Sequence, residues 1–550
     1  MTAFVAELLR GDGPVRATSI ADVRAGSWIV GHVRLDGRCT LRHALGGAGV
    51  ATENAATDTQ LVFAAWRAWR ETATERLIGD YTFALWDHRE RTLFCARDQL
   101  GVRPLYWAEM DRTFVCSNVL GDVRAHARVS SRLHEPAIVS FLQRGYNADT
   151  STTSFADVRR LPPGHQMVVR DDASVITPRK YWSFPVPESL RLTRDDEYVE
   201  RFRDVLGEAV RDRLRTDRAA ILLSGGLDST SIAATARRVS PATRLSAWTN
   251  DPGPSQPPDE NRLAAAVAAT LGIAHEIIRM EPAPFIDPDD AAFRTPEPLD
   301  EPGWREHVRQ LEQISSGAPV LLNGEDGDAL FRPPGLLTML RSWPARDVLR
   351  RVMRYTVSHR HHPHLGVWLR RRLRTVFSPR EDRVRRWIRQ DARAGARVPP
   401  SAGPHETRPD AVRYLADPIW QHVLESAQTA YTGVPLEIVW PFLDVRVMEF
   451  VFSVPPVPWC QRKELIRRSF RDELPDEVLT RRKEPLRGLF EEQVARWRAA
   501  PHKRKLGGAV CEFVDTRSVA DTLERGSVDD VLAVRRVFVL DQWLRSTPGG

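Results

Sequence analysis

Cysteine and long apolar runs are both scarce in this sequence. Its five cysteines are scattered over 550 residues and form no CxxC pair, which excludes a disulfide framework and a cysteine zinc site and favours a reducing compartment. No stretch approaches the roughly 18–20 apolar residues needed to cross a bilayer. The first residues lack a basic stretch followed by an apolar core, so we expect no signal peptide. A cytoplasmic protein fits these absences best.

Internal repeats, low-complexity tracts and a strong charge of one sign are also missing. Lys and Arg number 79 against 72 Asp and Glu, an excess that permits an anionic ligand without demanding nucleic acid. Hydrophobic residues make up 42% of the chain and charged residues 27%, as in ordinary globular enzymes. At about 100–200 residues per domain, the length predicts about two to four domains.

Two different element patterns divide the chain near residue 190. The first part has short apolar runs broken by Gly, Asp and Arg turns, which predicts a β-rich unit with an amphipathic helix over 59–69. From 195 onward helices alternate with strands, as in a parallel sheet. The strands expected there are 219–223, 245–249, 275–280 and 319–323, and the helices include 196–214 and 259–271.

The segment Leu222–Thr230, LLSGGLDST, follows the first of these strands and opens a helix. Its glycines allow close approach to a ligand, and a helix N-terminus offers N–H groups to an anion. No Gly-Lys-Ser/Thr follows, so this is not the Walker loop. Asp228 would repel a phosphate unless a cation lay between them, so it predicts Mg²⁺. The alternative is a structural glycine turn capped by serine.

A second acidic segment, Asn323–Asp328 or NGEDGD, follows the last of the predicted strands. Because the carboxyl ends of parallel strands meet at one edge of a sheet, we expect both loops at that edge, where such sheets bind ligands. Three acids with two glycines suit a second metal carboxylate and an acid/base carboxylate. Alone, the segment would also be typical of a solvated acidic turn.

Four motifs of the second part resemble, in order and spacing, the synthetase domain of the asparagine synthetase family. Besides the two loops, the chain has Pro441-Phe442-Leu443-Asp444 for the family's PFLD and Lys483 in an RRK-type segment. Stretches of the first part resemble the family's glutaminase domain, at 79–87, 97–106, 161–164 and 181–182. The resemblance implies an α/β protein. On this resemblance we expect an N-terminal nucleophile (Ntn) hydrolase-like α+β sandwich over 1–190 and a Rossmann-like PP-loop synthetase domain with a helical C-terminal part over 195–550.

The resemblance also implies a reaction, in which ATP adenylates a carboxylate and an amine then forms an amide, and it gives each matching residue a role. Asp228 and Asp328 would hold Mg²⁺ on the phosphates of ATP. Glu325 would lie near the acyl-adenylate. Lys483 would stabilise charge as the amide forms, unless it is a surface cation in a basic run. The residues expected to bind ATP and pyrophosphate are Leu222, Ser224, Gly225, Gly226, Asp228, Ser229, Thr249, Asn323 and Gly324.

The glutaminase-like part departs from the family at its functional positions. A working glutaminase needs Cys at position 2, where this chain has Thr2. The family's glutamine-binding RGPD and NGEIYN segments are missing too, and Gly31–Arg38 stands in place of the second. Although Thr can be an N-terminal nucleophile, these departures together predict a domain that keeps its fold without hydrolysing glutamine. The amine must then come from the substrate itself.

Loss of the glutaminase nucleophile is typical of lasso peptide cyclases, which are macrolactam synthetases, and of β-lactam synthetases. We favour the cyclase because β-lactam synthetases, which also resemble the family, have Tyr at this position of the second loop, whereas this chain has Glu325. The Arg-rich stretch 370–397 would add surface for a peptide, unless it is a solvated basic helix pair. Trp440 and Asp444 are candidate substrate residues, although Trp440 is equally plausible as a packed core residue.

The cyclase hypothesis predicts a precursor or core peptide as substrate, with a leader-recognition protein and a leader peptidase as partners. Ring closure would join an Asp or Glu side chain to the new N-terminal amine, helped by proximity. The alternatives are a β-lactam synthetase-like small-molecule enzyme and a non-catalytic peptide-binding scaffold. The histidines His361, His362 and His364 lack a Cys or carboxylate framework, so we expect a surface loop there and no metal site.

Overall fold

The computed structural model describes most of the chain, and every structural statement below concerns the described residues. These are 3–10, 15–52, 57–170, 176–251, 259–281, 284–286, 295–360, 362–363, 385–393, 405–481, 489–499 and 506–547.

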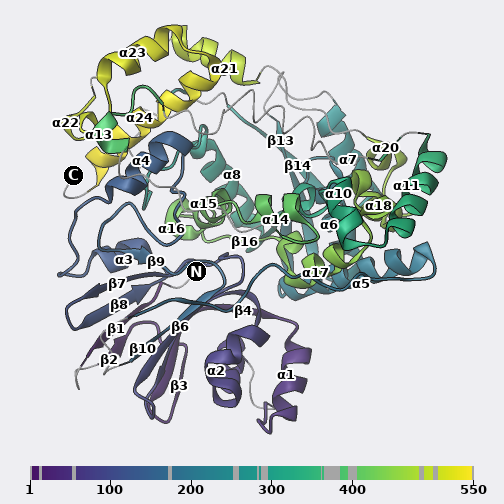
Figure 1. The fold of residues 1–550 in the computed structure, drawn as a ribbon, viewed down its shortest axis with the longest axis horizontal. Coiled ribbons are helices and arrows are strands. Elements are labelled where there is room, and N and C mark those ends of the chain that lie inside the picture. The colour runs from purple at the N-terminus through teal and green to yellow at the C-terminus, as the bar shows by residue number, and fades with distance from the viewer. Residues whose placement is uncertain are drawn as a thin grey trace.

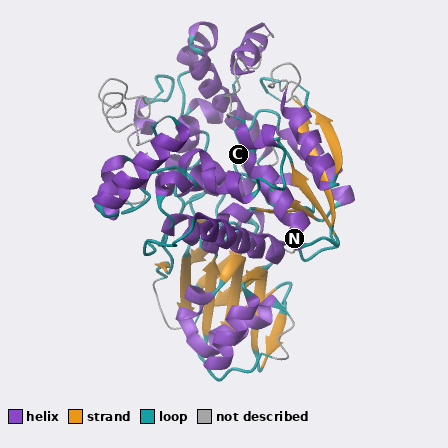
Figure 2. Cartoon of the chain, turned by 90° about the vertical axis from the view of Figure 1, so that its right-hand side faces the viewer, coloured by secondary structure: helices purple, strands orange, loops and turns teal. Residues whose placement is uncertain are grey.

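Two antiparallel sheets form the N-terminal part of the molecule, at the lower left of Figure 1 and the bottom of Figure 2. The strand orders are β2-β1-β8-β7-β9 and β11-β10-β6-β5-β4-β3. Phe4 and Phe114 of one sheet are buried with Trp28 and Met167 of the other, so the sheets pack face to face. The strands are β1 (Val5–Leu9), β2 (Val15–Ala17), β3 (Asp22–Arg24), β4 (Ser27–Asp36), β5 (Ile78–Asp87), β6 (Thr92–Arg97), β7 (Tyr106–Met110), β8 (Thr113–Ser117), β9 (Arg159–Arg160), β10 (His165–Arg170) and β11 (Arg179–Lys180).

Helices α1 (Arg38–Gly47) and α2 (Asp58–Trp69) cover the outer face of the six-stranded sheet, where Leu41, Leu61 and Phe83 share one buried cluster. The start of α2 is fixed by a capping box, because the Thr57 side chain accepts from the backbone N–H of Gln60 and the Gln60 side chain accepts from that of Thr57. The predicted β-rich unit with its amphipathic helix is thus confirmed.

A five-stranded parallel sheet forms the second part, with the order β14-β13-β12-β15-β16. The four predicted strands are all present, with ends shifted by one or two residues. A fifth, β16, was not predicted, because three residues carry too little pattern. The strands are β12 (Arg218–Leu222), β13 (Arg244–Asp251), β14 (Ala274–Arg279), β15 (Val320–Leu322) and β16 (Glu437–Val439).

The strand order reverses direction between β12 and β15, which are direct neighbours. The chain leaves β12 toward β13 and β14 on one side and returns to β15 on the other. In open α/β sheets, ligands bind in the crevice outside the carboxyl ends of the strands at such a switch point. The two predicted ligand loops, after β12 and after β15, therefore lie where a ligand is expected.

Helices surround the parallel sheet, and the predicted helices over 196–214 and 259–271 are found as α5 and α7. Helix α6 packs closely on the sheet because its buried positions are small, Ala233 and Ala236 among them. The helices of this part are α5 (Asp195–Arg213), α6 (Leu227–Val239), α7 (Asp259–Leu271), α8 (Trp304–Gly317), α9 (Gly327–Leu330), α10 (Leu336–Ser342), α11 (Ala345–His359), α14 (Pro409–Leu415), α15 (Ile419–Ser426), α16 (Thr429–Thr432), α17 (Val445–Ser453), α18 (Pro456–Trp459), α19 (Glu464–Ser469) and α20 (Asp476–Thr480).

The C-terminal helices pack on the N-terminal part rather than on the parallel sheet. Helix α24 (Val528–Ser546) lies against α4 (Glu135–Arg144), as Figure 1 shows, and the two share one apolar cluster. Trp387 belongs to the same cluster and is 2% exposed, and Arg385 pairs with Asp530 at 2.9 Å. Trp387 and Ile388 of the Arg-rich stretch are therefore packed against the fold, whereas Arg386 and Arg389 are exposed. Residues 370–384 and 394–397 lie outside the described ranges. The remaining helices here are α3 (Leu120–Arg124), α13 (Gln390–Arg393), α21 (Leu489–Ala499), α22 (Gly508–Cys511) and α23 (Thr516–Arg525).

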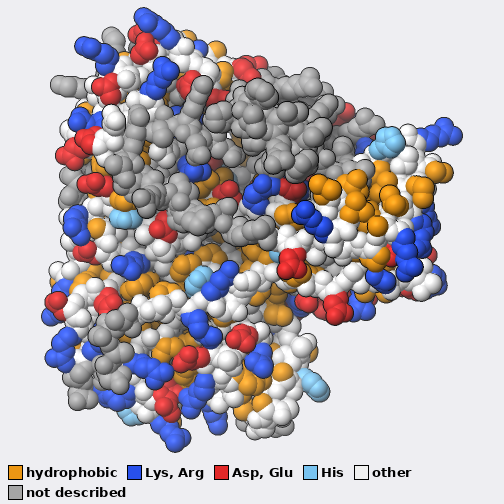
Figure 3. Space-filling view, in the orientation of Figure 1, with side chains coloured by type: hydrophobic (Ala, Val, Ile, Leu, Met, Phe, Trp, Pro, Cys, Tyr) orange, Lys and Arg blue, Asp and Glu red, His pale blue; other side chains and the backbone are white. Residues whose placement is uncertain are grey.

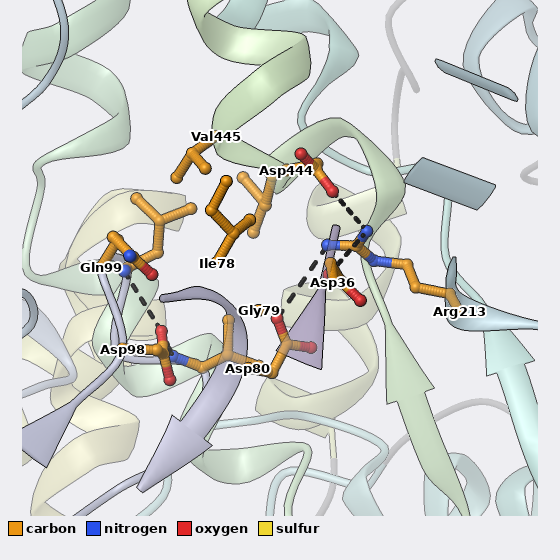
Figure 4. A pocket seen from close by; sticks show the side chains of 12 residues that line it. Asp36, Ile78, Gly79, Asp80, Asp98, Gln99, Arg213, Asp444 and Val445 are labelled. Atoms are coloured by element: carbon orange, nitrogen blue, oxygen red, sulfur yellow. Dashed lines mark hydrogen bonds and ion pairs between the residues drawn. The ribbon is translucent and has the colours of Figure 1, made fainter. Parts of the chain in front are cut away.

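A buried ion-pair network joins the two parts where the end of α5 and the start of α17 meet strands β4 and β5 (Figure 4). Arg213 lies among three carboxylates, with Asp444 at 2.7 Å, Asp36 at 3.3 Å and Asp80 at 4.0 Å. Arg34 pairs with the last two of these from the N-terminal side. Burial by itself would raise the pKa of Asp444, but Arg213 and Arg446 hold that pKa below its ordinary value.

A second junction is built around Glu425 of α15. Its carboxylate accepts from Arg97 at 3.1 Å, from Arg160 at 3.1 Å and from the Tyr106 hydroxyl at 3.2 Å. All three donors come from the N-terminal part, and Glu425 is 2% exposed. Such pairs fix one relative arrangement of the two parts, because a displaced charge would be left buried without its partner.

One exposed surface is unusually apolar. Figure 3 shows hydrophobic side chains gathered over the region where α10 and α11 lie in Figure 1. They include Leu349, Met353 and Val357, which follow one another at four-residue spacing on the exposed face of α11. Contiguous apolar surface of this kind is typical of contact with another protein. No described helix combines the length and the apolar character that crossing a membrane requires.

Replacing Glu425 by Gln tests whether the second junction stabilises the fold. The amide keeps the shape but leaves Arg97 and Arg160 buried without a compensating charge, so we expect unfolding in urea to require about 3–5 kcal/mol less free energy. The matched control is Glu477→Gln, which breaks the exposed pair with Arg262 and should leave the urea midpoint unchanged. Equal midpoints for Glu425→Gln and the unaltered protein would contradict this role.

Candidate active site

The loop after β12 is shaped by its two glycines. Gly225 has φ +63°, and a Cβ there would lie 2.9 Å from Leu263 Cβ and 3.0 Å from a backbone oxygen of α7, so only glycine fits. Gly226 then provides the N-cap of α6. The hydroxyls of Ser224 and Ser229 lie 3.2 Å apart. The free N–H groups at the start of α6 and these two hydroxyls can donate to an anion.

The loop after β15 presses directly against this helix start. A Cβ on Gly324 would lie 2.6 Å from Ser229 Cα, and one on Gly327 would lie 2.5 Å from Asp228 Cγ. Both glycines are therefore required by the approach of the first loop. Asn323 continues the sheet, because its N–H donates to the carbonyl of Val439 at 2.9 Å. The structure thus brings the two predicted loops into contact.

The carboxylates of Asp228 and Asp328 converge on one cation, the ammonium of Lys463. Lys463 Nζ lies 2.7 Å from Asp228 Oδ1 and 2.5 Å from Oδ2, and it also pairs with Asp328. Lys463 has φ +57° and the preceding Arg462 has φ +49°. Two successive non-glycine residues in this region cost free energy and are found chiefly where a site demands them.

Sequence reasoning missed Lys463. Lys463 lies 235 residues from Asp228 in the sequence. No local sequence pattern marks it as part of the site. One signal was present: the chain has only five lysines among its 79 basic residues. A site that needs the compact ammonium group of lysine cannot use the larger, planar guanidinium of arginine. In a chain with so few lysines, each lysine is therefore a candidate site residue.

Asp326 is a buried carboxyl beside this cation site. It has φ +81° and occupies the position of the second glycine in the GEGxDE-like pattern, which explains the backbone conformation. Neither carboxyl oxygen has a hydrogen-bond partner among the described residues. Burial, together with the charges of Glu325 and Asp228, raises the pKa of Asp326 well above its ordinary value, which favours the neutral form.

The predicted nucleotide-binding residues Leu222 and Thr249 lie at the same edge. Leu222 ends β12, and the Thr249 hydroxyl donates to the carbonyl of Leu223 at 2.6 Å. The same hydroxyl lies 2.8 Å from His275 Nε2, a contact that sequence reasoning did not anticipate. Burial lowers the pKa of His275, so its ring is held neutral at neutral pH. Leu222, Thr249 and the neutral His275 therefore place uncharged side chains at this edge, with Thr249 buried.

The other predicted residues are placed differently. Trp440 is 2% exposed within the main core, and Asp444 is committed to Arg213 and Arg446 in the junction described above. We therefore assign both a structural role in place of the expected substrate contact. Lys483 and Thr2 lie outside the described residues, as do His361 and His364.

The donor set fits Mg²⁺ bound together with a phosphate ligand. Asp228 and Asp328 supply two carboxylates aimed at one point, and magnesium sites of this kind need only one or two carboxylates plus phosphate oxygens. The described residues contain no group of three or more His, Cys, Asp or Glu side chains arranged to hold a metal ion. A cage made by protein side chains alone is therefore not found in those ranges.

Comparison with known proteins gives the following matches. Residues 201–544 match the family described as "Asparagine synthase", and residues 39–182 match "Glutamine amidotransferase domain". Glutamine-hydrolyzing asparagine synthetase 3 of Bacillus subtilis (strain 168) is 23% identical over 461 residues, which is 78% of this chain and 70% of that protein.

Two further relatives match over a shorter span. A putative glutamine-hydrolyzing asparagine synthetase of Mycobacterium bovis is 30% identical over 52% of this chain and 44% of its own length. Amidase chry2 of Gibberella zeae is 26% identical over 52% of this chain and 46% of its own length. The chain thus spans about half the length of these two relatives.

Removing the ammonium of Lys463 tests whether this point is a cation site. In Lys463→Met, Asp228 and Asp328 lose the ammonium that they share, so we expect a loss of about 2 kcal/mol, between the values for exposed and buried pairs. Added Mg²⁺ should restore part of the loss, whereas the thermal midpoint of the unaltered protein should respond little to Mg²⁺ alone. Lys180→Met, on an exposed edge strand, is the control. An unchanged midpoint without any Mg²⁺ response would contradict the assignment.

Proposed function

The chain belongs to the asparagine synthase family, and from this premise we propose that it activates a carboxylate with ATP and joins it to an amine. Members of the family are ATP-dependent, AMP-forming carbon–nitrogen ligases. The observation that carries the proposal is the convergence of Asp228 and Asp328 on one cation at the switch point of the parallel sheet. That geometry suits a nucleotide triphosphate with its metal ion.

The first step forms an acyl-adenylate. A carboxylate oxygen attacks the α-phosphorus of ATP, and the bond to the β-phosphate oxygen breaks and releases pyrophosphate. The N–H groups at the start of α6 and the hydroxyls of Ser224 and Ser229 would bind the pyrophosphate. Asp228 and Asp328 would hold Mg²⁺, which when bound neutralises phosphate charge. Lys463 adds a positive charge beside them.

The second step forms the amide. The amine nitrogen attacks the acyl carbon, the bond from that carbon to the AMP oxygen breaks, and AMP leaves. Glu325 is exposed on the loop after β15, and its backbone N–H donates to the Asn323 side-chain Oδ1 at 2.9 Å. Glu325 remains our candidate for the carboxylate near the acyl-adenylate. Lys483 remains our candidate for stabilising the charge that develops.

We propose that the amide is the macrolactam of a lasso peptide. An Asp or Glu side chain of the core peptide would be adenylated, and the N-terminal amine would close the ring. Two observations support this choice over ammonia-dependent chemistry. Position 2 is Thr, and Gly31–Arg38, which stands where the family binds glutamine, carries Arg34 and Asp36 locked in the buried junction. The partners of the reaction would be a leader-recognition protein and a leader peptidase.

Two other functions make different predictions. A β-lactam synthetase-like enzyme would support pyrophosphate exchange with a free β-amino acid, and Glu325 in place of Tyr speaks against it. A non-catalytic scaffold would give the same product yield after Asp228→Ala. The convergence of Asp228 and Asp328 on one cation argues against a scaffold, because a protein that only presents a peptide has no need of two carboxylates suited to a metal–phosphate site.

Pyrophosphate exchange tests the adenylation step. With Mg²⁺, ATP and a leader-free core peptide as substrate, we expect exchange of labelled pyrophosphate into ATP, one AMP per amide, and a product one water lighter than the linear peptide. Asp228→Asn should lower the exchange rate about 100-fold or more, because it removes a preorganised charge from the metal–phosphate site. Lys180→Met is the control. Release of ADP in place of AMP would refute the adenylation proposal.

Incubation with glutamine tests the loss of glutaminase activity. Because neither the family's cysteine nor its glutamine-binding segments are present, we expect no glutamate release, and Thr2→Cys alone should not create it. Ammonium salts should likewise fail to raise the rate of AMP formation when the peptide is saturating. Glutamate release that depends on Thr2 and is abolished by Thr2→Ala would contradict the proposal.

A further inference from the structure

The exposed apolar stripe of α11 is a second packing face of that helix. Leu349, Met353 and Val357 are 54%, 62% and 80% exposed, and their four-residue spacing places them on one side of the helix. On the opposite side, Val348 and Tyr355 are buried in a small apolar cluster with residues of α10 and α18. The fold thus uses one face of α11 and leaves a row of large apolar side chains in water, which is typical of a protein contact site.

A hollow lies on another side of the same helix, between α10, α11 and the start of α18. It holds about 280 Å³ of empty volume, part of it continuous with solvent. Apolar side chains dominate its lining, Met339, Trp343 and Val457 among them, and its charged lining residues are Asp347 and Arg351. A concave apolar site of this kind accepts an anchoring side chain of a partner.

Arginines lie between the stripe and the hollow. An α-helix turns by about 100° per residue, so Arg350 and Arg354 follow Met353 around the axis of α11. Arg351, which lines the hollow, comes next, and Arg346 falls within the stripe itself. Basic side chains also border the hydrophobic surface in Figure 3. The stripe, these arginines and the hollow are together called the α11 face, and around the helix it alternates from apolar to basic to apolar.

The positive charge of the α11 face is weakly compensated. Asp347 is the one acidic residue of α11, and it pairs with Arg350 at 2.6 Å. Arg354 has a side chain that is 77% exposed and reaches Asp195 only at 3.9 Å. Arg346 is exposed and has no ion pair with any described residue. Because exposed pairs of this kind contribute little, the face is complementary to a ligand with negative charge.

The same charges argue against a second copy of this chain as the occupant. In a two-fold dimer one patch forms both sides of the interface, so the arginines of one α11 would face those of the other. Like charges placed opposite each other across an interface are strongly unfavourable. The sequence that follows α11 is basic as well, with Arg370, Arg371, Arg372 and Arg374, so its charge does not complement the face either.

The pattern also differs from that of a helix that lies on a membrane. Such a helix presents one continuous apolar face to the acyl chains and keeps its basic residues on the polar face. In α11 the arginines interrupt the apolar surface, and a flat lipid surface would leave the hollow empty. A segment of another protein, with its own relief and its own charges, fits both features.

We propose that the α11 face binds a helix of a partner protein in which apolar side chains alternate with Asp or Glu. One apolar side chain of that helix fills the hollow, and others cover the stripe. Its carboxylates pair with Arg350 and Arg354. This is the helix-in-groove mode of recognition, in which anchors recur at i, i+3 or i+4, and i+7. The inference goes beyond the proposed function and does not depend on it.

A display library of helical peptides tests the chemistry of the partner. Its peptides of about 20 residues are long enough to form a helix, and they sample apolar, acidic, basic and neutral residues at each position. The library is selected on the full-length protein and counter-selected on the triple variant Leu349→Ser, Met353→Ser, Val357→Ser. We expect the surviving peptides to carry apolar anchors at helical spacing with Asp or Glu between them. Their affinity should fall as the salt concentration rises.

Single variants then assign the contacts, with the selected peptide of highest affinity as the probe in fluorescence anisotropy. Met353→Ser should weaken binding about tenfold or more, as the loss of an interface anchor does. Arg354→Gln should chiefly slow association and reduce its salt dependence. The controls are Val23→Ser, at a position 59% exposed on β3, and Arg132→Gln, whose side chain is 76% exposed; neither should change binding. Because all four side chains are exposed, the urea midpoints should stay equal.

Each outcome decides the proposal. Acidic amphipathic peptides whose binding needs the stripe support it. Basic peptides, peptides that bind the triple variant equally well, or a selection without any peptide that depends on the stripe would overturn it. Two further measurements compare the unaltered protein with the triple variant. Stripe-dependent sedimentation with phosphatidylglycerol vesicles would assign the face to a membrane instead, and a stripe-dependent dimer in sedimentation velocity would assign it to a second copy.

Discussion

Two backbone segments approach each other so closely at the centre of the parallel sheet that only glycine fits between them. The start of α6 lies against Gly324 and Gly327, where any Cβ would fall within 2.6 Å of Ser229 or Asp228. This approach brings the carboxylates of Asp228 and Asp328 onto one cation. With a side chain at either glycine the loops would separate, and the sheet would keep its fold but lose the shared cation site. The glycines of the second loop are therefore a requirement of the site and not merely of a turn.

The N-terminal sandwich contributes to the site from a distance. Its Arg160 pairs both with Glu425, which ties the two parts together, and with Glu297, which holds the segment before α8. Arg34 and Asp36 occupy the junction with Arg213 and Asp444. The N-terminal sandwich is thus tied to the part that carries the parallel sheet by buried ion pairs. Buried charges are suited to that task, because they tolerate one arrangement of their partners and destabilise others.

The sequence predicted the parallel sheet and its two ligand loops because their signals are local. A buried apolar strand followed by a glycine loop and a helix can be recognised within about 15 residues, and LLSGGLDST and NGEDGD both have that context. Strand β16 was missed because Glu437–Val439 is too short to show a pattern. The antiparallel unit was predicted for the same local reason, although its packing against α24 was not.

Local sequence patterns could not predict the roles of side chains whose contacts lie far away in the sequence. Lys463 meets Asp228 across 235 residues of chain, and nothing beside it in the sequence indicates that contact. Asp444 lies in the PFLD motif and was expected near the substrate, but its neighbours Arg213 and Arg446 commit it to the junction.

The most direct test of the account is a crystal structure of the protein with Mg²⁺ and a non-hydrolysable α,β-methylene analogue of ATP. The account predicts triphosphate density between the loop after β12 and the loop after β15, with a metal ion bonded to Asp228 and Asp328 and with Lys463 displaced toward the phosphates. Phosphates bound elsewhere, or both loops empty while Lys463 still bridges the two carboxylates at saturating nucleotide, would contradict it.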